Sequence, residues 1–112
     1  MKYLVLIFSN ADTTRTGSEE DLRGLFALRD ELAGTGELVS AEGLSLPQAG
    51  KVVRVREGAK VITDGPFGEA KEQIAGYFLI DCLDDERADE IAGRVSAVID
   101  DRVEVRGVLL SA

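Results

Sequence analysis

Residues 64–72 bring together the side chains best suited to chemistry. The segment begins Asp64-Gly65-Pro66-Phe67-Gly68 and continues through Glu69, Lys71 and Glu72, so it holds four charges and an aromatic ring. The Gly65-Pro66 pair predicts a stiff turn, because proline fixes its own φ angle. Carboxylates near a lysine can pass a proton to or from a bound ligand. We therefore take Asp64, Glu72 and Lys71 as candidate catalytic residues.

Two arginines precede this segment on one face of a predicted strand. In residues 51–57, Val53 and Val55 alternate with Arg54 and Arg56, which is typical of a strand with two different faces. If the strand folds against the segment, its arginines meet the carboxylates. This contact is either a salt-bridge network that only fixes the loop, or a pocket where an arginine clamps an anionic ligand and a carboxylate accepts a proton. The candidate ligand-binding residues are Arg54, Arg56, Asp64, Phe67, Glu69 and Lys71.

The composition of the chain excludes several kinds of site. Its 112 residues include no histidine, which rules out Ser-His-Asp triads, Cys-His pairs and imidazole-ligated metals. The acidic residues lack the spacing of a calcium loop, and no glycine-rich dinucleotide or phosphate motif is present. We therefore expect neither a metal nor an organic cofactor. The net charge of −8 argues against nucleic-acid binding, which needs clustered lysine and arginine.

The cysteine content and the start of the chain indicate a cytoplasmic protein. Cys82 is the one cysteine, so no disulfide can form within the chain, which fits a reducing compartment. The apolar run at residues 3–8 is too short for an export signal and better predicts a buried strand. We expect no membrane association, and a single domain that spans residues 1–112.

Hydrophobic periodicity predicts six strands and two helices. The strands are expected at residues 3–8, 38–44, 51–57, 60–63, 77–82 and 102–110. Ser18 is the predicted N-cap of the first helix, which Gly34 and Gly36 should end, and Asp84-Asp85-Glu86 should begin the second. The buried stripe of the first helix is predicted to be Leu22, Leu25, Phe26, Leu32 and Ala33. That of the second is predicted to be Ala88, Ile91, Ala92, Val95, Val98 and Ile99.

This order of elements predicts a ferredoxin-like α+β sandwich with an inserted β-hairpin. Two helices can cover only one face of such a sheet. Residues 3–8, 77–82 and 103–110 nevertheless carry apolar side chains that we expect on both faces. An uncovered apolar face indicates an association site, and a second copy around a twofold axis is its natural partner. We therefore expect a homodimer.

The central segment also resembles the signature of a known family. Asp64-Gly65-Pro66-Phe67, then Glu69-Ala70-Lys71-Glu72, then Gly76 before Tyr77-Phe78 resemble the D-G-P-F, E-x-K-E and glycine-aromatic elements of the YCII-related, or DGPF-domain, family. The resemblance extends from Met1 to about Val108. The supporting segments are Lys2-Tyr3, Ala41-Glu42-Gly43-Leu44, Val53-Arg54-Val55-Arg56 and Val103-Glu104-Val105-Arg106.

This resemblance carries expectations about fold and function. It implies a dimeric α-β barrel built from ferredoxin-like subunits. The YCII branch has a His-Asp pair suited to acid–base chemistry, and that half of the site does not carry over to a chain without histidine. Members of the DGPF branch are often encoded beside extracytoplasmic-function sigma factors, which implies a regulatory context.

Three functions are compatible with the sequence. The first is a homodimeric protein that binds a small organic ligand in a cleft near Asp64-Gly65-Pro66-Phe67, as an accessory to sigma-factor regulation. The alternative is a cofactor-free enzyme that uses carboxylate or lysine acid–base chemistry in the same cleft. A purely structural interaction protein is the third. The missing histidine and the missing cofactor motifs favour the first.

Overall fold

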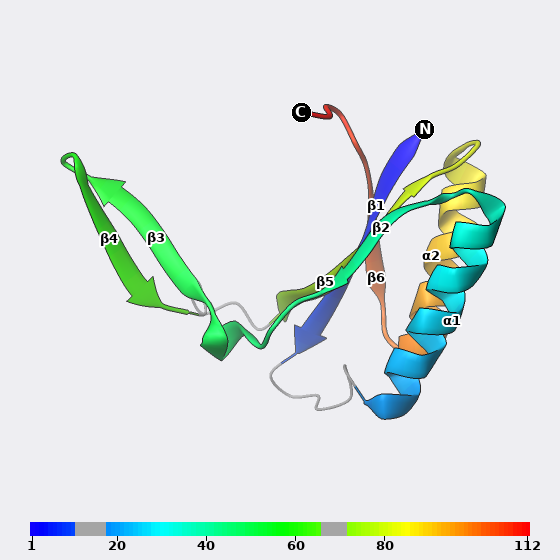
Figure 1. Ribbon diagram of the computed structural model, residues 1–112, viewed down its shortest axis with the longest axis horizontal. Helices are drawn as coiled ribbons and strands as arrows, with labels where there is room; N and C mark the ends of the chain where they lie inside the picture. The colour runs from blue at the N-terminus through cyan, green and yellow to red at the C-terminus, as the bar shows by residue number, and fades with distance from the viewer. Residues whose placement is uncertain (11–17, 66–71) are drawn as a thin grey trace.

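The computed structural model describes residues 1–10, 18–65 and 72–112 (Figure 1). Phe67, Glu69 and Lys71 lie outside the described residues. The elements, in chain order, are β1 (Lys2–Asn10), α1 (Glu19–Thr35), β2 (Leu38–Gly43), the short 3-10 helix η1 (Pro47–Ala49), β3 (Lys51–Arg56), β4 (Ala59–Asp64), β5 (Glu72–Asp81), α2 (Asp85–Ile99) and β6 (Val103–Gly107).

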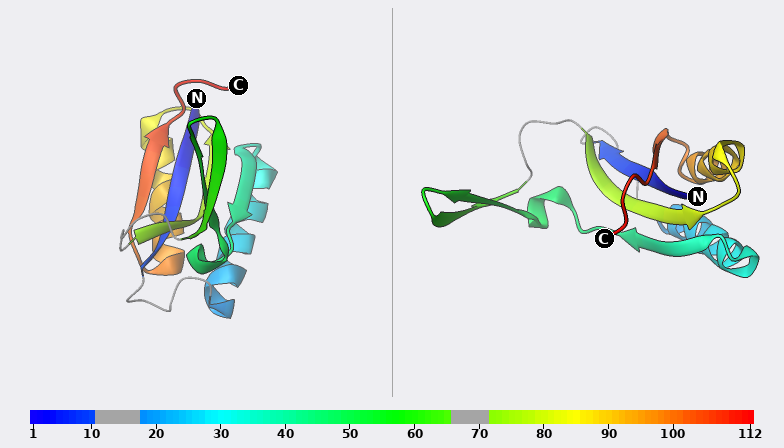
Figure 2. Two further views of the ribbon diagram at one scale, coloured as in Figure 1. Left: turned by 90° about the vertical axis from the view of Figure 1, so that its left-hand side faces the viewer. Right: turned by 90° about the horizontal axis from the view of Figure 1, so that it is seen from above.

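Four of the strands form one antiparallel sheet in the order β2-β5-β1-β6. Both helices cover the same face of this sheet, as Figure 2 shows from above. Strands β3 and β4 form a separate two-stranded sheet that projects from the opposite side. The architecture confirms the predicted ferredoxin-like α+β fold with an inserted hairpin. Neither described helix is long and apolar enough to cross a membrane.

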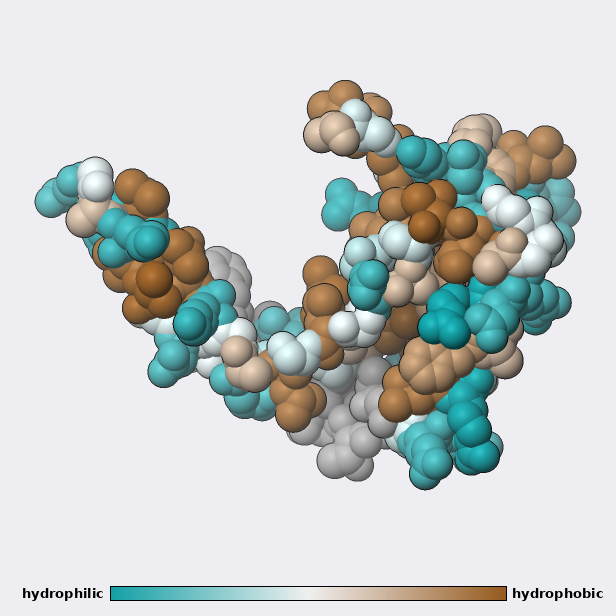
Figure 3. Space-filling model, viewed as in Figure 1, coloured by the Kyte–Doolittle hydropathy of each residue, from teal (hydrophilic) through white to brown (hydrophobic). Residues whose placement is uncertain are grey.

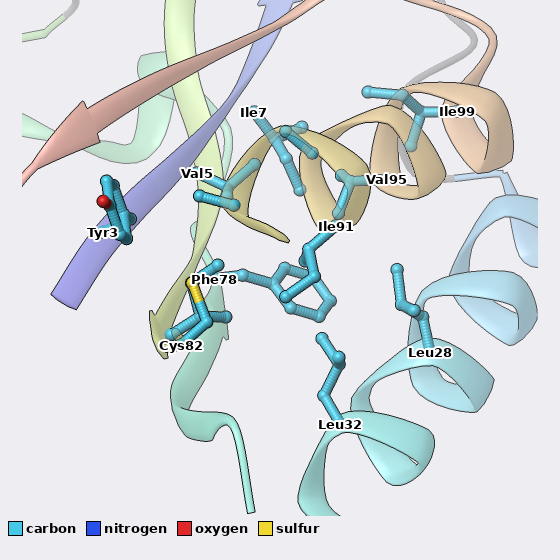
Figure 4. Packing of buried hydrophobic residues seen from close by; sticks show 13 residues of the cluster. Tyr3, Val5, Ile7, Leu28, Leu32, Phe78, Cys82, Ile91, Val95 and Ile99 are labelled. Atoms are coloured by element: carbon cyan, nitrogen blue, oxygen red, sulfur yellow. The ribbon is translucent and has the colours of Figure 1, made fainter. Parts of the chain in front are cut away.

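Successive side chains of β1 alternate between the helix-covered face of the sheet and its open face. Tyr3, Val5 and Ile7 point toward the helices and belong to the buried core (Figure 4). The predicted stripe of α2 is confirmed, because its members are buried or, for Val98, partly buried against the core. The core cluster is Tyr3, Val5, Ile7, Leu28, Leu32, Phe78, Ile80, Cys82, Ala88, Ile91, Ala92, Val95 and Ile99.

The predicted stripe of α1 is partly wrong. Leu32 is buried as expected, but Leu28, which the prediction omitted, is buried too. Leu22 is 41% exposed and Phe26 is 51% exposed, and Ala33 faces solvent. The physical reason is that the first half of α1 borders an open pocket and only the second half packs closely on the sheet.

The ends of the helices follow local capping rules. The Ser18 hydroxyl accepts a hydrogen bond from the backbone N–H of Asp21, and Asp84 caps α2 in the same way through the N–H of Arg87. Gly36 ends α1 with a φ of 82°, in the left-handed region that glycine adopts without strain. Gly34 lies inside the helix, so its predicted role as a stop is wrong.

The largest differences from the predicted strand boundaries, at β5 and β6, arise because pairing decides strand length. Strand β5 begins at Glu72 and not at residue 77, since its first residues pair with the far end of β1. Strand β6 ends at Gly107 and not at residue 110, because only five of its residues pair with β1. Leu109 and Leu110 are exposed. The prediction that β6 is apolar on both faces is also wrong, because Glu104 and Arg106 occupy the face turned away from the core.

A bidentate ion pair joins the start of β2 to α2. Arg87 donates from Nη2 to Glu37 Oε1 at 2.8 Å and from Nε to Glu37 Oε2 at 2.9 Å. These bonds, with one from the Thr35 hydroxyl, hold the pKa of Glu37 at about 2, against an ordinary 4.5. The side chains are 17% and 30% exposed for Glu37 and Arg87, so solvent screens the pair only in part.

We expect this pair to make unfolding pH-dependent. Because the folded pKa of Glu37 is depressed, its contribution is complete above about pH 4.5 and disappears as the pH falls toward 2. Glu37→Gln should lower the free energy of unfolding by about 1–2 kcal/mol at neutral pH and by almost nothing near pH 2. Urea unfolding at both pH values measures this. Glu90→Gln is the control, since Glu90 contacts the same arginine from an exposed position. An equal loss in the two variants would contradict the assignment.

Candidate functional site

A pocket of about 520 Å³ opens between α1 and the edge of the sheet. This volume falls in the range of small-molecule binding sites, which are mostly apolar with a few polar groups that orient the ligand. Side chains and backbone from α1, β1, β2, β5 and η1 meet there. The lining residues are Ile7, Ser9, Leu22, Leu25, Phe26, Arg29, Ala41, Glu42, Gly43, Leu44, Ser45, Leu46, Pro47, Ala75, Gly76, Tyr77 and Phe78.

The floor of the pocket is hollow because two glycines lie opposite each other in the sheet. Gly43 of β2 pairs with Gly76 of β5, which in turn pairs with the core residue Ile7 of β1. Directly paired residues point to the same face, so both glycines lie on the helix side of the sheet. With no side chain at either position, the sheet leaves space below α1.

The two glycines differ in their surroundings. A Cβ atom at Gly76 would lie 2.7 Å from the backbone oxygen of Glu42, so β2 can approach β5 this closely only beside a glycine. A Cβ atom at Gly43 would meet nothing within 4 Å. Gly76 therefore sets the spacing of the two strands, and Gly43 leaves open space in the pocket.

The wall contributed by α1 combines apolar and cationic groups. Leu22, Leu25 and Phe26 supply the apolar surface. The guanidinium of Arg29 lies over the Phe26 ring, 4.8 Å from its centre, in cation–π geometry. Arg29 also donates to the neighbouring Asp30 at 3.0 Å. A planar cation therefore lies beside an aromatic ring in the wall of the pocket.

The start of the Asp64-Gly65-Pro66-Phe67 motif packs behind the pocket wall. Gly65 donates its N–H to the Gly50 carbonyl at 2.8 Å, and a Cβ atom on Gly65 would lie 2.8 Å from the carbonyl oxygen of Pro47. Pro47 itself lines the pocket. Asp64 is exposed and pairs in register with Lys51 at the base of the hairpin.

The structure does not bring the two predicted arginines to Asp64 within one chain. Arg54 pairs with Val61 and Arg56 with Ala59, nearer the tip of the hairpin. Arg54 lies three register positions from the level of Asp64, a separation of about 10 Å along the strand. In the described parts of the chain, neither arginine forms an ion pair.

Glu72 has a different cationic partner from the one the sequence suggested. It is half-buried at the start of β5 and forms an ion pair with Arg102, which precedes β6. Strands β5 and β6 both run antiparallel to β1, so their starts lie at the same end of the sheet. The sequence alone could not predict Arg102 as the partner of Glu72, because only the order of strands in the sheet brings the two residues together.

Other titratable groups have structural roles. Burial raises the pKa of the Cys82 thiol, as expected for a packed core cysteine rather than a reactive one. The Tyr3 hydroxyl donates to Asp85 at the start of α2, and this bond raises the pKa of Tyr3 to about 12. Among residues 1–10, 18–65 and 72–112, no group of three or more Asp, Glu or Cys side chains could hold a metal ion.

Comparison with known proteins identifies the family. The model of the YCII-related domain matches residues 1–110. The chain belongs to the YCII-related family. It is also similar to an uncharacterized protein of Rhizobium meliloti (strain 1021), with 32% identity over 100 residues, which cover 86% of this chain and 81% of that protein. The family resemblance inferred from the sequence is confirmed. In this YCII-related chain the pocket lies within a single protomer, between α1 and the paired glycines Gly43 and Gly76.

Proposed function

We propose that this YCII-related protein is a homodimer that binds a small, mainly apolar organic ligand in the pocket between α1 and the sheet. The observation that carries the proposal is the pocket itself, with about 520 Å³ of space above two facing glycines. Leu22 and Phe26 line the pocket and leave apolar surface exposed there. Unfilled apolar surface of this kind marks binding sites.

The polar groups of the lining suit a ligand with a charged or hydrogen-bonding end. Arg29 is the one cation that lines the pocket among the described residues. Glu42 borders the pocket with its backbone, because register places its side chain on the open face of the sheet. Asp64 precedes Gly65, and Gly65 packs against Pro47 in the pocket lining. Asp64 therefore stays a candidate for contact with the ligand, together with Phe67, Glu69 and Lys71. An accessory role in sigma-factor regulation and a cytoplasmic location belong to the same proposal, supported by the family resemblance and by a single buried cysteine.

The homodimer is supported by the face of the sheet that the helices leave open. Register places Leu4, Leu6, Tyr77 and Leu79 together on this face. Ser40 and Glu42 flank them on β2, and Glu104 and Arg106 flank them on β6. An apolar centre with a polar rim is the composition of a protein–protein interface.

The second candidate is a cofactor-free enzyme that uses carboxylate chemistry in the same pocket. Asp64 favours it, because it adjoins Gly65, which packs on Pro47 of the pocket lining, and a carboxylate there could accept a proton from a bound substrate. The predicted carboxylates, Asp64 and Glu72, are not themselves among the lining residues. Turnover that Asp64→Asn abolishes without loss of ligand binding would support the enzyme.

Filling the pocket from Gly43 tests the binding proposal. The fluorescent probe anilinonaphthalene sulfonate combines an apolar body with an anionic end and emits more strongly in apolar pockets. We expect Gly43→Phe to weaken probe binding at least about tenfold, because the new ring occupies the pocket while its Cβ atom meets no backbone.

Gly107→Phe is the matched control, since Gly107 also lies on an edge strand with open space around its Cβ position and does not line the pocket. It should bind the probe as the wild type does. Unchanged binding by Gly43→Phe, or no binding by the wild type, would exclude this pocket as the site.

A further inference from the structure

The β3–β4 hairpin, residues 51–64, stands apart from the rest of the molecule and is called the arm below (Figure 1). All of its residues are exposed except Val52, which is half-buried. An isolated two-stranded hairpin is at best marginally stable in water, because it has no second layer to pack on. Nothing in the described parts of its own chain packs over the arm as a second layer, although a two-stranded hairpin needs such a layer to be stable.

One face of the arm has an apolar centre. Register places Val53 opposite Ile62, with Val55 next to them on the same side. These three side chains are 57%, 52% and 69% exposed, respectively. Lys60 lies opposite Val55 on this side, and the other side carries Arg54 and Arg56 together with Val61. Figure 3 shows the hydrophobic surface of the arm, separated by open space from the body of the molecule.

The exposed area of the chain is larger than that of a compact monomer. The chain exposes 7885 Å². A compact monomer of its 12.0 kDa mass exposes about 6,000 Å², so the excess is about 1,900 Å². A standard interface buries about 800 Å² on each partner. The excess is therefore more than enough for a stable dimer.

The arm and the body also carry opposite net charges. Lys51, Arg54, Arg56 and Lys60 stand against Glu57 and Asp64 in the arm, which gives +2. Since the whole chain carries −8, the remaining residues carry −10. None of the four arm cations forms an ion pair in the described parts of the chain. The arm is thus complementary in charge to the body of another copy.

We propose that the arm of each protomer clasps the body of the second copy, with its Val53, Val55 and Ile62 face against that copy. This inference rests on the homodimer of the proposed function. The open sheet face and the C-terminal end of the chain lie on the same side of the sheet as the arm (Figures 1 and 2). One second copy can therefore cover all three, and the twofold axis makes the clasp reciprocal. It also brings Lys60, which lies opposite Val55 on the same side of the arm, toward the carboxylates of the other chain.

Two aspartate variants of the arm test the clasp. Val55→Asp places a charge on the apolar face, and Ala59→Asp places the same charge on the opposite face of the same exposed hairpin. Sedimentation of the full chain gives the dimer dissociation constant. We expect Val55→Asp to raise it at least about tenfold and Ala59→Asp less than about threefold. Equal effects of the two variants would overturn the proposal.

The same experiment separates this inference from the homodimer itself. A wild type that sediments as a monomer would overturn both. A wild-type dimer whose dissociation constant Val55→Asp leaves unchanged would overturn the clasp and leave the sheet contact standing.

A fluorescence measurement gives an independent readout. The chain has no tryptophan, so Val55→Trp places the single one on the apolar face. Its emission should shift to shorter wavelength as the protein concentration rises through the dissociation constant, while that of Ala59→Trp should not. A concentration-independent spectrum in a dimeric Val55→Trp variant would contradict the clasp.

Discussion

Leu6→Asp is expected to convert the proposed homodimer into folded monomers, whereas Val5→Asp one residue earlier is expected to unfold the chain. Val5 is fully buried among core side chains under the helices, so a carboxylate there has neither water nor a partner. An unpaired buried charge costs roughly 3–5 kcal/mol or more, comparable with the whole stability of a small domain.

Leu6 lies on the other face of the same strand. It pairs with Tyr77 on one side and Glu104 on the other, at the centre of the open face. Truncating or charging a central apolar residue of an interface costs about 2–4 kcal/mol, so the dissociation constant should rise roughly 30-fold to 1,000-fold. Sedimentation reports the mass, and circular dichroism reports the fold.

The two variants carry the same chemical change, so each is the control for the other. Because Leu6 is 8% exposed, Leu4→Asp, farther along the same face, serves as a second variant if Leu6→Asp folds poorly. A dimer of unchanged affinity in both folded variants would show that the open face is not the interface. A folded Val5→Asp would show that β1 has the opposite orientation.

Local sequence rules predicted much of the fold because they depend on near neighbours. The alternation in β1, the caps at Ser18 and Asp84, and the hairpin turn all follow from interactions within a few residues. The turn at Glu57-Gly58 has positive φ at both positions, which matches the twist of a tight hairpin. These features confirm the fold class that the order of elements predicted.

The pocket could not be predicted in the same way, because it depends on which elements become neighbours. Leu22 and Phe26 have helical spacing typical of a buried stripe, yet they border a hollow that two distant glycines create. The ion pair of Glu72 with Arg102 likewise depends on sheet order. The partners of such charged residues are set by long-range pairing, which local sequence does not show.

The facing glycines give the second large expected effect. Gly76→Ala is expected to lower the free energy of unfolding by about 3 kcal/mol, the upper part of the range for overpacking a closely packed site. The new Cβ atom would lie 2.7 Å from the backbone oxygen of Glu42, and neither backbone can yield as a flexible side chain would. The melting temperature should fall by about 10 °C or more.

Gly43→Ala is the matched control, because it makes the same change directly across the strand pair. Its Cβ atom meets nothing within 4 Å, and alanine costs less backbone entropy on folding than glycine, so stability should stay equal or rise by up to about 1 kcal/mol. Thermal unfolding of the two variants measures the contrast. Equal stability of the two would mean that β2 and β5 do not need a glycine at their contact. Probe binding adds a functional readout, because Gly76→Ala must push β2 away from β5 and thereby deform the floor of the pocket, while Gly43→Ala leaves the spacing of the strands as it is.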